Sequence, residues 1–127
     1  MLAPPVRRFL ERRVDNIEQL EIVLLLSQYS DRSWTAADVA SSLRLVERAA
    51  AAHLETLAGR HLLDVRLGHD VRYRFSPATP ELSAIVKQVA ETYRDQRSEI
   101  VAFVSARLQS LRDFADAFRL KKDRDDG

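Results

Sequence analysis

The side chains of this sequence with the clearest chemical potential are arginines, which make up 17 of its 20 basic residues. A guanidinium is a planar fork of donors that can bind a phosphate or the edge of a nucleic-acid base. The net charge of the chain is only +1, so an anion-binding surface has to be a local cluster rather than a general positive field. Five arginines are candidates by their positions in the elements described below: Arg44, Arg48, Arg66, Arg72 and Arg74.

Patterns typical of catalysis or metal binding are missing from the sequence. It has no cysteine, no Gly-rich phosphate loop and no Gly-x-Ser-x-Gly nucleophile elbow. The three histidines, His53, His61 and His69, lack the i, i+4 spacing of a helical ligand pair. His53, beside Leu54, is expected to be a half-buried packing residue. We therefore predict a protein that is not an enzyme and needs no metal or other cofactor.

Segments that would direct the chain to a membrane are also missing. Residues 1–13 hold two prolines and four arginines instead of the apolar stretch of a secretory signal. The longest aliphatic run, residues 22–26, is far shorter than the ~20 residues that a membrane-spanning helix needs. We expect a cytoplasmic protein with no membrane partner.

Two helices are expected before residue 31. The prolines at 4 and 5 can open the first, because proline at the first helical position gives up only an N–H that has no helical partner. Asp15, with Glu18 three residues later, predicts a capping box for a second helix that runs to about Ser30. Its residues are apolar nearly all round, which is typical of a helix in the middle of a core.

A pair of shorter helices follows. Thr35 and Asp38 have the spacing of a second capping box, for a brief helix that ends near Leu43. The next helix begins at about Val46, and Gly59 is placed to end it. Its apolar face is formed by Ala50, Leu54 and Leu57, which leaves an outward face of Arg48, Ala51, Ala52 and Glu55.

Residues 63–75 have the period of a β-hairpin. Apolar and polar residues alternate on both sides of Gly68-His69-Asp70, a turn-forming centre. The apolar positions are Leu63, Val65, Leu67, Val71, Tyr73 and Phe75. Arg66, Arg72 and Arg74 share the polar face, and His69 is at the tip.

This order of helix, capped helix, tight turn, helix and hairpin resembles that of bacterial winged helix-turn-helix transcriptional regulators of the broad MarR-like group. The stretches 34–43, 45–57 and 61–63 carry the resemblance, which covers about half of the chain. It implies that helix 46–58 faces the major groove of DNA and that the hairpin 63–75 is the wing. The fold expected is mostly α with a small β-hairpin: a winged helix-turn-helix, an N-terminal helix and a long C-terminal helical region. The DNA-binding residues implied are Arg44, Arg48, Ala51, Ala52, Arg66, His69, Arg72 and Arg74.

Two functions fit this fold. One is a dimeric DNA-binding transcriptional regulator, and the other is a winged-helix module that binds another protein and does not read DNA sequence. Two alanines on the outward face of helix 46–58 offer at most apolar contact to a thymine methyl group. The segment 34–63 is also neutral, because Arg44, Arg48 and Arg60 are matched by Asp38, Glu47 and Glu55.

The C-terminal third reads as helix, with no glycine or proline between Glu81 and residue 126. A seam of heptad spacing includes Leu82, Val86, Val89, Tyr93, Ile100 and Phe103, with Gln96 as its one polar member. A helix of this length exceeds what a domain of about 60 residues can cover, so we predict a homodimer that uses this seam. The alternative is a tail that folds back to complete a monomeric core. Near residues 104–110 the seam shifts by four residues, which indicates a stutter in a continuous helix or, as we expect, a bend.

The last apolar feature is a patch of Leu111, Phe114 and Phe118. We expect it to pack on the body of the protein, and the alternative is a docking site for a protein partner. The predicted organisation is an N-terminal helix with the winged helix-turn-helix in 1–80, a helical dimerisation region in 81–120 and a charged tail in 121–127.

Overall fold

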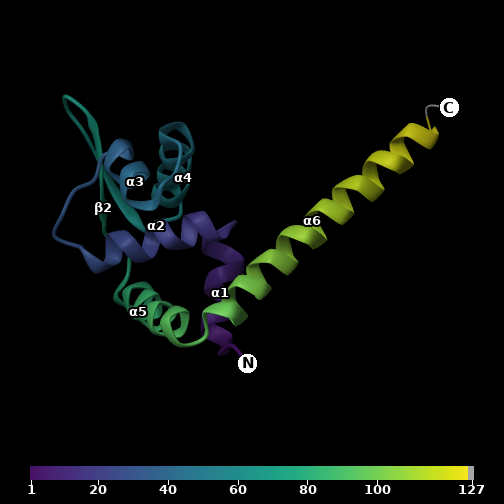
Figure 1. Cartoon of the computed structure of the whole chain (residues 1–127), viewed down its shortest axis with the longest axis horizontal. Coiled ribbons are helices and arrows are strands. Elements are labelled where there is room, and N and C mark those ends of the chain that lie inside the picture. Colours follow the sequence, from purple (N-terminus) through teal and green to yellow (C-terminus); the bar gives the residue numbers. More distant parts are fainter. Residues whose placement is uncertain (126–127) are drawn as a thin grey trace.

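In the computed structural model, a group of packed helices carries a hairpin on one side, and a single long helix leads away from it (Figure 1). The structure describes residues 1–125, and side chains as far as residue 119. The predicted mostly α fold with one hairpin is confirmed. Its elements are α1 (Pro4–Arg13), α2 (Ile17–Gln28), α3 (Ala36–Leu43), α4 (Glu47–Gly59), β1 (Leu63–Leu67), β2 (Val71–Phe75), α5 (Pro80–Asp95) and α6 (Arg97–Asp125).

Helix α2 forms the centre of the core, as its apolar composition predicts, and Leu20, Ile22, Val23 and Leu26 are fully buried. Its N-cap differs from the prediction. The Asn16 side chain accepts the backbone N–H of Gln19 at 2.8 Å, while Asp15 binds Arg60 at 2.9 Å. Asparagine caps a helix as well as aspartate does, so Asp15 is free to pair with a residue 45 positions away. The predicted Asp15–Glu18 capping box is therefore wrong.

The helix-turn-helix is built from local interactions that the sequence predicts. Thr35 and Asp38 form both hydrogen bonds of the capping box, at 3.1 and 3.0 Å. Arg44 ends α3 in the left-handed conformation, with φ 57°, and the N–H of Leu45 then bonds to the carbonyl of Ala40 at 2.9 Å. Helix α4 buries Ala50, Leu54 and Leu57 completely, as expected.

The hairpin pairs β1 and β2 antiparallel, with Leu63 opposite Phe75 and Leu67 opposite Val71. Trp34, just before α3, adds a short bridge to Tyr73, with both N–H to carbonyl distances at 2.7 Å. Trp34, Leu63 and Tyr73 are buried at this junction. The base of the hairpin is thus fixed to the start of α3, while its tip extends past α3 and α4 (Figure 1).

The C-terminal region is two helices rather than one, and the break lies at Gln96. This residue caps α5 with its N–H on the carbonyl of Thr92 at 2.6 Å, and α6 then runs without interruption through residues 104–110. The bend expected in that stretch is wrong, so the shift of the seam there is a stutter in a continuous helix. The chain turns at Gln96 instead, because α5 packs on α1 and α2, whereas α6 contacts the C-terminal end of α1.

Arg107 fixes α6 at that point. Its guanidinium donates to the carbonyls of Leu10 and Val14, both at 2.9 Å, which satisfies acceptors that the end of α1 leaves without helical partners. Beyond it α6 leaves the body (Figure 1). Phe114 and Phe118 are 72% and 65% exposed, so the expectation that this patch packs on the body is wrong. Helix α6 continues into the predicted tail of residues 121–127, of which 126 and 127 lie outside the described residues.

Candidate nucleic-acid interface

Two predicted DNA-binding arginines lie at the turn between α3 and α4. Arg44 occupies the left-handed position in the turn, and Arg48 is in the first turn of α4. Both are exposed, and among the described residues neither forms a salt bridge or a side-chain hydrogen bond. Their donors are therefore available to an external acceptor such as a phosphate or a guanine edge.

The rest of the outward face of α4 offers few polar groups. Ala52 is exposed and Ala51 half-buried, and the Thr56 hydroxyl is engaged, since it donates to the carbonyl of Ala52 at 3.1 Å. Glu47 and Glu55 are also exposed. Helix α4 thus presents one free guanidinium, on Arg48, beside small side chains and two carboxylates.

The wing carries its charged side chains on one face. The register places Arg66 directly opposite Arg72, a like-charge pair that costs stability unless anions lie close by. Asp70 supplies one, through two hydrogen bonds to Arg72 at 2.9 and 3.2 Å. The hydrogen bonds and the charge of Asp70 raise the pKa of Arg72 above its ordinary value. Arg66 is only loosely paired, with Asp64 at 3.9 Å. Two adjacent guanidinium groups so placed would suit a phosphate backbone.

Arg74 and His69, both predicted to bind DNA, have different surroundings in the structure. The Arg74 guanidinium donates to the carbonyl of Ser30 at 3.0 Å and lies 3.9 Å from Asp31, so it fastens the base of the wing to the loop after α2. His69 is exposed at the tip of the hairpin. Of the predicted wing residues, His69, Arg66 and Arg72 are therefore the ones placed to reach a ligand.

The bridge from Trp34 to Tyr73 holds the wing close to the start of α3, and charges of the two elements affect each other. The pKa of Asp38 in α3 is lowered, mainly by the backbone N–H of Thr35, and the positive charges of Arg32 and Arg72 add to this. The pKa of Tyr73 in β2 is raised, mainly by burial and further by the charge of Glu55 in α4. Arg72 of the hairpin thus acts on Asp38 of α3, and Glu55 of α4 acts on the buried Tyr73 of β2.

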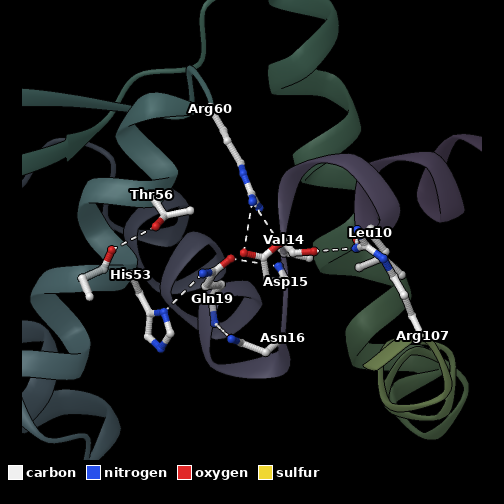
Figure 2. A network of polar contacts seen from close by, with 10 residues as sticks. Leu10, Val14, Asp15, Asn16, Gln19, His53, Thr56, Arg60 and Arg107 are labelled. Atoms are coloured by element: carbon white, nitrogen blue, oxygen red, sulfur yellow. Dashed lines mark hydrogen bonds and ion pairs between the residues drawn. The ribbon is translucent and has the colours of Figure 1, made fainter. Parts of the chain in front are cut away.

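Sequence reasoning missed two sets of contacts near this surface. Arg32 stacks over the Trp34 ring at 3.7 Å and lies 3.8 Å from Asp38, which places another cation at the start of α3. The second set joins α2 to α4 (Figure 2), and we call it the α2–α4 polar bridge. It consists of the Asp15–Arg60 ion pair and of a chain of contacts from Gln19 to His53 to Glu18.

One signal in the sequence could have indicated this bridge. Gln19 is a polar residue in a helix that is apolar nearly all round, and it is buried with 3% exposure. Buried amides require hydrogen-bond partners, so a partner on a neighbouring helix was implied, although the sequence does not say which. The Arg60 guanidinium is paired with Asp15 within the bridge, and Arg13 also donates to the Arg60 carbonyl at 2.6 Å. The exposed charges of the predicted reading head are therefore those of Arg44, Arg48, Glu47 and Glu55.

The predicted dimer seam lies mostly inside the chain. Helix α5 packs against α1 and α2, which buries the first three seam residues within a single copy. The buried members are Leu82, Val86, Val89 and Ile100, and the half-buried members are Tyr93 and Phe103. Burial, together with the charge of Glu21, raises the pKa of Tyr93, whose hydroxyl donates to Glu21 at 3.1 Å. Among the side chains described on α6, the large apolar ones that remain exposed are the patch of Leu111, Phe114 and Phe118.

Metal-binding clusters and membrane-spanning helices are both absent from the described part of the chain. No group of three or more histidine, cysteine, aspartate or glutamate side chains there is arranged to hold a metal ion. None of the helices described is long and apolar enough to cross a membrane.

The fold that these elements define is a winged helix: a capped helix-turn-helix with a two-stranded wing at its side. No protein-family model and no curated protein matches the sequence. Solved structures match the fold. HlyU from Vibrio cholerae has a TM-score of 0.55 and is 22% identical, with 73% of this chain and 98% of that chain covered.

Two other solved structures show the same likeness. The transcriptional regulator HlyU from Vibrio vulnificus has a TM-score of 0.53 at 22% identity, over 68% of this chain and 85% of that chain. A variant of ZitR from Lactococcus lactis in its apo form has a TM-score of 0.52 at 17% identity, over 90% and 86% of the two chains. At such identities the likeness concerns the fold.

Proposed function

We propose that this protein is a dimeric DNA-binding transcriptional regulator that acts in the cytoplasm by binding rather than by catalysis. The observation that carries the proposal is the pair of exposed arginines at the turn between α3 and α4, Arg44 and Arg48, which have no ion-pair partner among the described residues, together with a wing that carries two adjacent guanidinium groups. The transcriptional regulator HlyU from Vibrio vulnificus has a similar fold. The MarR-like resemblance of the sequence is consistent with this function.

The two parts of the surface have different roles in this proposal. Helix α4 enters the major groove with its N-terminal turn, where Arg48 can form a bidentate contact to a guanine and Ala52 can contact a thymine methyl group. Arg44, Arg66 and Arg72 bind phosphates, which position the protein and carry no sequence information. Arg74 supports the wing from its base.

The projecting helix α6 would form the dimer. Its patch of Leu111, Phe114 and Phe118 is apolar, exposed and distant from the body, and a second copy of the same helix is a partner that closed two-fold symmetry supplies. The contact thereby lies further along the chain than the seam expected from the sequence, most of which is used inside one copy. Two reading heads on one dimer would favour a palindromic site.

Binding to DNA duplexes at several salt concentrations tests the function. Affinity for the preferred duplex should fall steeply with salt, because phosphate contacts release counterions. Arg48→Ala should relax sequence preference, at a cost of about 1–3 kcal/mol on the preferred site, whereas Arg72→Ala should weaken all sequences alike. Arg94→Ala, which removes an exposed guanidinium on α5 outside this surface, serves as the charge-matched control. Absence of binding at low salt, or an affinity that salt does not change, contradicts the proposal.

A second function has its own observation in favour. The neutral charge of the exposed reading head, with Glu47 and Glu55 close to Arg44 and Arg48, supplies little non-specific attraction to DNA. It would suit a winged helix that binds another protein through α4 or through the α6 patch. Co-purification of a stoichiometric protein partner, with no DNA retained at low salt, would establish this alternative.

A further inference from the structure

The donor and acceptor atoms of the α2–α4 polar bridge determine where its hydrogens lie. Gln19 accepts the backbone N–H of Asp15 at its Oε1, at 2.8 Å. A backbone N–H can only donate, so the oxygen of the amide must face Asp15 and the nitrogen must face His53. That nitrogen, Nε2, lies 3.2 Å from Nδ1 of His53. Because an amide nitrogen is a donor, Nδ1 has to be the acceptor and carries no hydrogen.

The same reasoning fixes the state of the whole imidazole. With Nδ1 as acceptor, the ring hydrogen is on Nε2, which lies 2.9 Å from Oε2 of Glu18 and donates to it. These contacts hold α4 against α2 through His53, whose contact with Gln19 is drawn in Figure 2, and they fit a neutral ring in one tautomer. The His53 side chain is only 17% exposed, so water cannot readily replace these contacts.

A proton on Nδ1 is incompatible with this arrangement. It would set the N–H of the ring against the N–H of Gln19, two donors face to face beside a buried amide. Rotation of the amide by 180° would only move the conflict to the N–H of Asp15. The Glu18 carboxylate gains from a charged ring, but it is more than half exposed, and solvent screens that gain.

The other charged groups near the bridge do not change the argument. On the described residues, the hydrogen bonds and salt bridges of His53 reach only Glu18 and Gln19. The next charges are the Asp15–Arg60 pair and Arg13, which donates to the Arg60 carbonyl. Carboxylates and guanidinium groups ordinarily keep their charge between about pH 5 and 8, the range in which an imidazole takes up its proton.

We propose that His53 is a pH-sensitive latch between α2 and α4, so that acidification loosens α4 and weakens DNA binding. The inference rests on the proposed function for its second half only. The neutral ring is the form that fits the contacts with Gln19 and Glu18, so its contribution to the folded helix pair is present in mildly alkaline solution and is lost on acidification. Loss of one buried hydrogen bond corresponds to roughly a tenfold change in an equilibrium constant.

The test compares three chains that differ at the bridge. His61 and His69, both exposed, are first replaced by glutamine, so that His53 is the only histidine and no protonated wing tip attracts DNA. Urea unfolding at about pH 8 and pH 5.5 is then measured for this parent, for the parent with His53→Gln and for the parent with Gln19→Glu. Glutamine at 53 can accept from Gln19 without titrating, so this variant reports how the stability of the rest of the protein depends on pH.

Relative to His53→Gln, the parent should lose about tenfold in its folding equilibrium constant between the two pH values. In Gln19→Glu the change should be reversed: relative to His53→Gln, its folding equilibrium constant should be higher at pH 5.5 than at pH 8. The reason is that a carboxylate can accept from both the N–H of Asp15 and a protonated ring. Equal pH dependence in the three chains would overturn the latch, and so would a loss in Gln19→Glu that matches the parent.

DNA affinity of the same chains at the two pH values tests the second half. The parent should bind about tenfold more weakly at pH 5.5 than at pH 8, after correction by the His53→Gln chain. If unfolding shows the latch but affinity follows His53→Gln, the link from α4 to DNA is refuted. If no chain binds DNA at either pH, the proposed function fails, and the unfolding data still decide whether His53 is a latch.

Discussion

Replacement of Phe114 and Phe118 together by alanine is expected to convert the protein to a monomer without unfolding it. A phenylalanine presents about 200 Å², so exposed fractions of 72% and 65% leave about 270 Å² of aromatic surface on each copy. At ~25 cal/mol/Å² this is about 7 kcal/mol of gross hydrophobic free energy per copy. Lost rigid-body and side-chain freedom offsets much of it on association.

Truncation of a well-packed interface aromatic typically costs about 2 kcal/mol or more. The double variant removes two such residues from each copy, and partial burial reduces the effect, so we expect a loss of at least about 4 kcal/mol per dimer. That loss raises the dissociation constant about a thousandfold. Folding should be unaffected within about 0.5 kcal/mol, because the patch contacts nothing in the body and alanine is a good helix former.

Sedimentation velocity over a range of protein concentrations measures the change. A matched control replaces Gln109 and Asp116, exposed residues that point away from the patch on the same helix, by alanine. A wild-type protein that sediments as a monomer at micromolar concentration would refute the reasoning. So would a double variant that dimerises as tightly as the control.

Four further predictions concern the fold that carries the site. Thr35→Ala should lower the free energy of unfolding by about 1 kcal/mol through loss of the capping box, as measured by urea denaturation. The pKa of Asp38 is lowered below 3.8, so its contribution is present above about pH 4 and is lost as the pH falls through the lowered value; in Asp38→Asn this acid-dependent loss should be absent. Leu54→Ala in the fully buried face of α4 should destabilise by about 2–5 kcal/mol, and equal stability would show that α4 does not pack as described. Arg107→Leu should free the start of α6 from the carbonyls of Leu10 and Val14, seen as faster amide hydrogen exchange in residues 97–107, whereas Arg107→Lys should restore part of the protection.

Interactions of short range were predictable from the sequence. The capping box of Thr35 and Asp38 is one example, since its partners are three residues apart and their spacing alone specifies the bonds. The hairpin is another, because alternation on both sides of Gly68 sets which side chains share a face once the strands pair. The outward face of α4 also followed from the helical period, and Arg48 and Ala52 are exposed as expected.

Choices among equivalent partners were not predictable. Asp15 and Asn16 are equally good caps, and only the position of Arg60 on α4 decides that Asp15 is used for the ion pair. In the same way, the heptad seam gives no indication of whether Leu82 and Val89 face a second copy or α1 of the same chain. The structure shows them buried within the chain.

The sequence by itself therefore determined the helices and strands up to residue 75, the capping box of α3 and the face that α4 buries, because these depend on backbone hydrogen bonds and side-chain periods within a few residues. Only the tertiary structure decided the turn at Gln96, the polar bridge from Gln19 to His53 and the exposure of Phe114. Each of these depends on which surfaces meet across tens of residues of chain. An apolar stripe or a buried amide requires a partner but does not specify it.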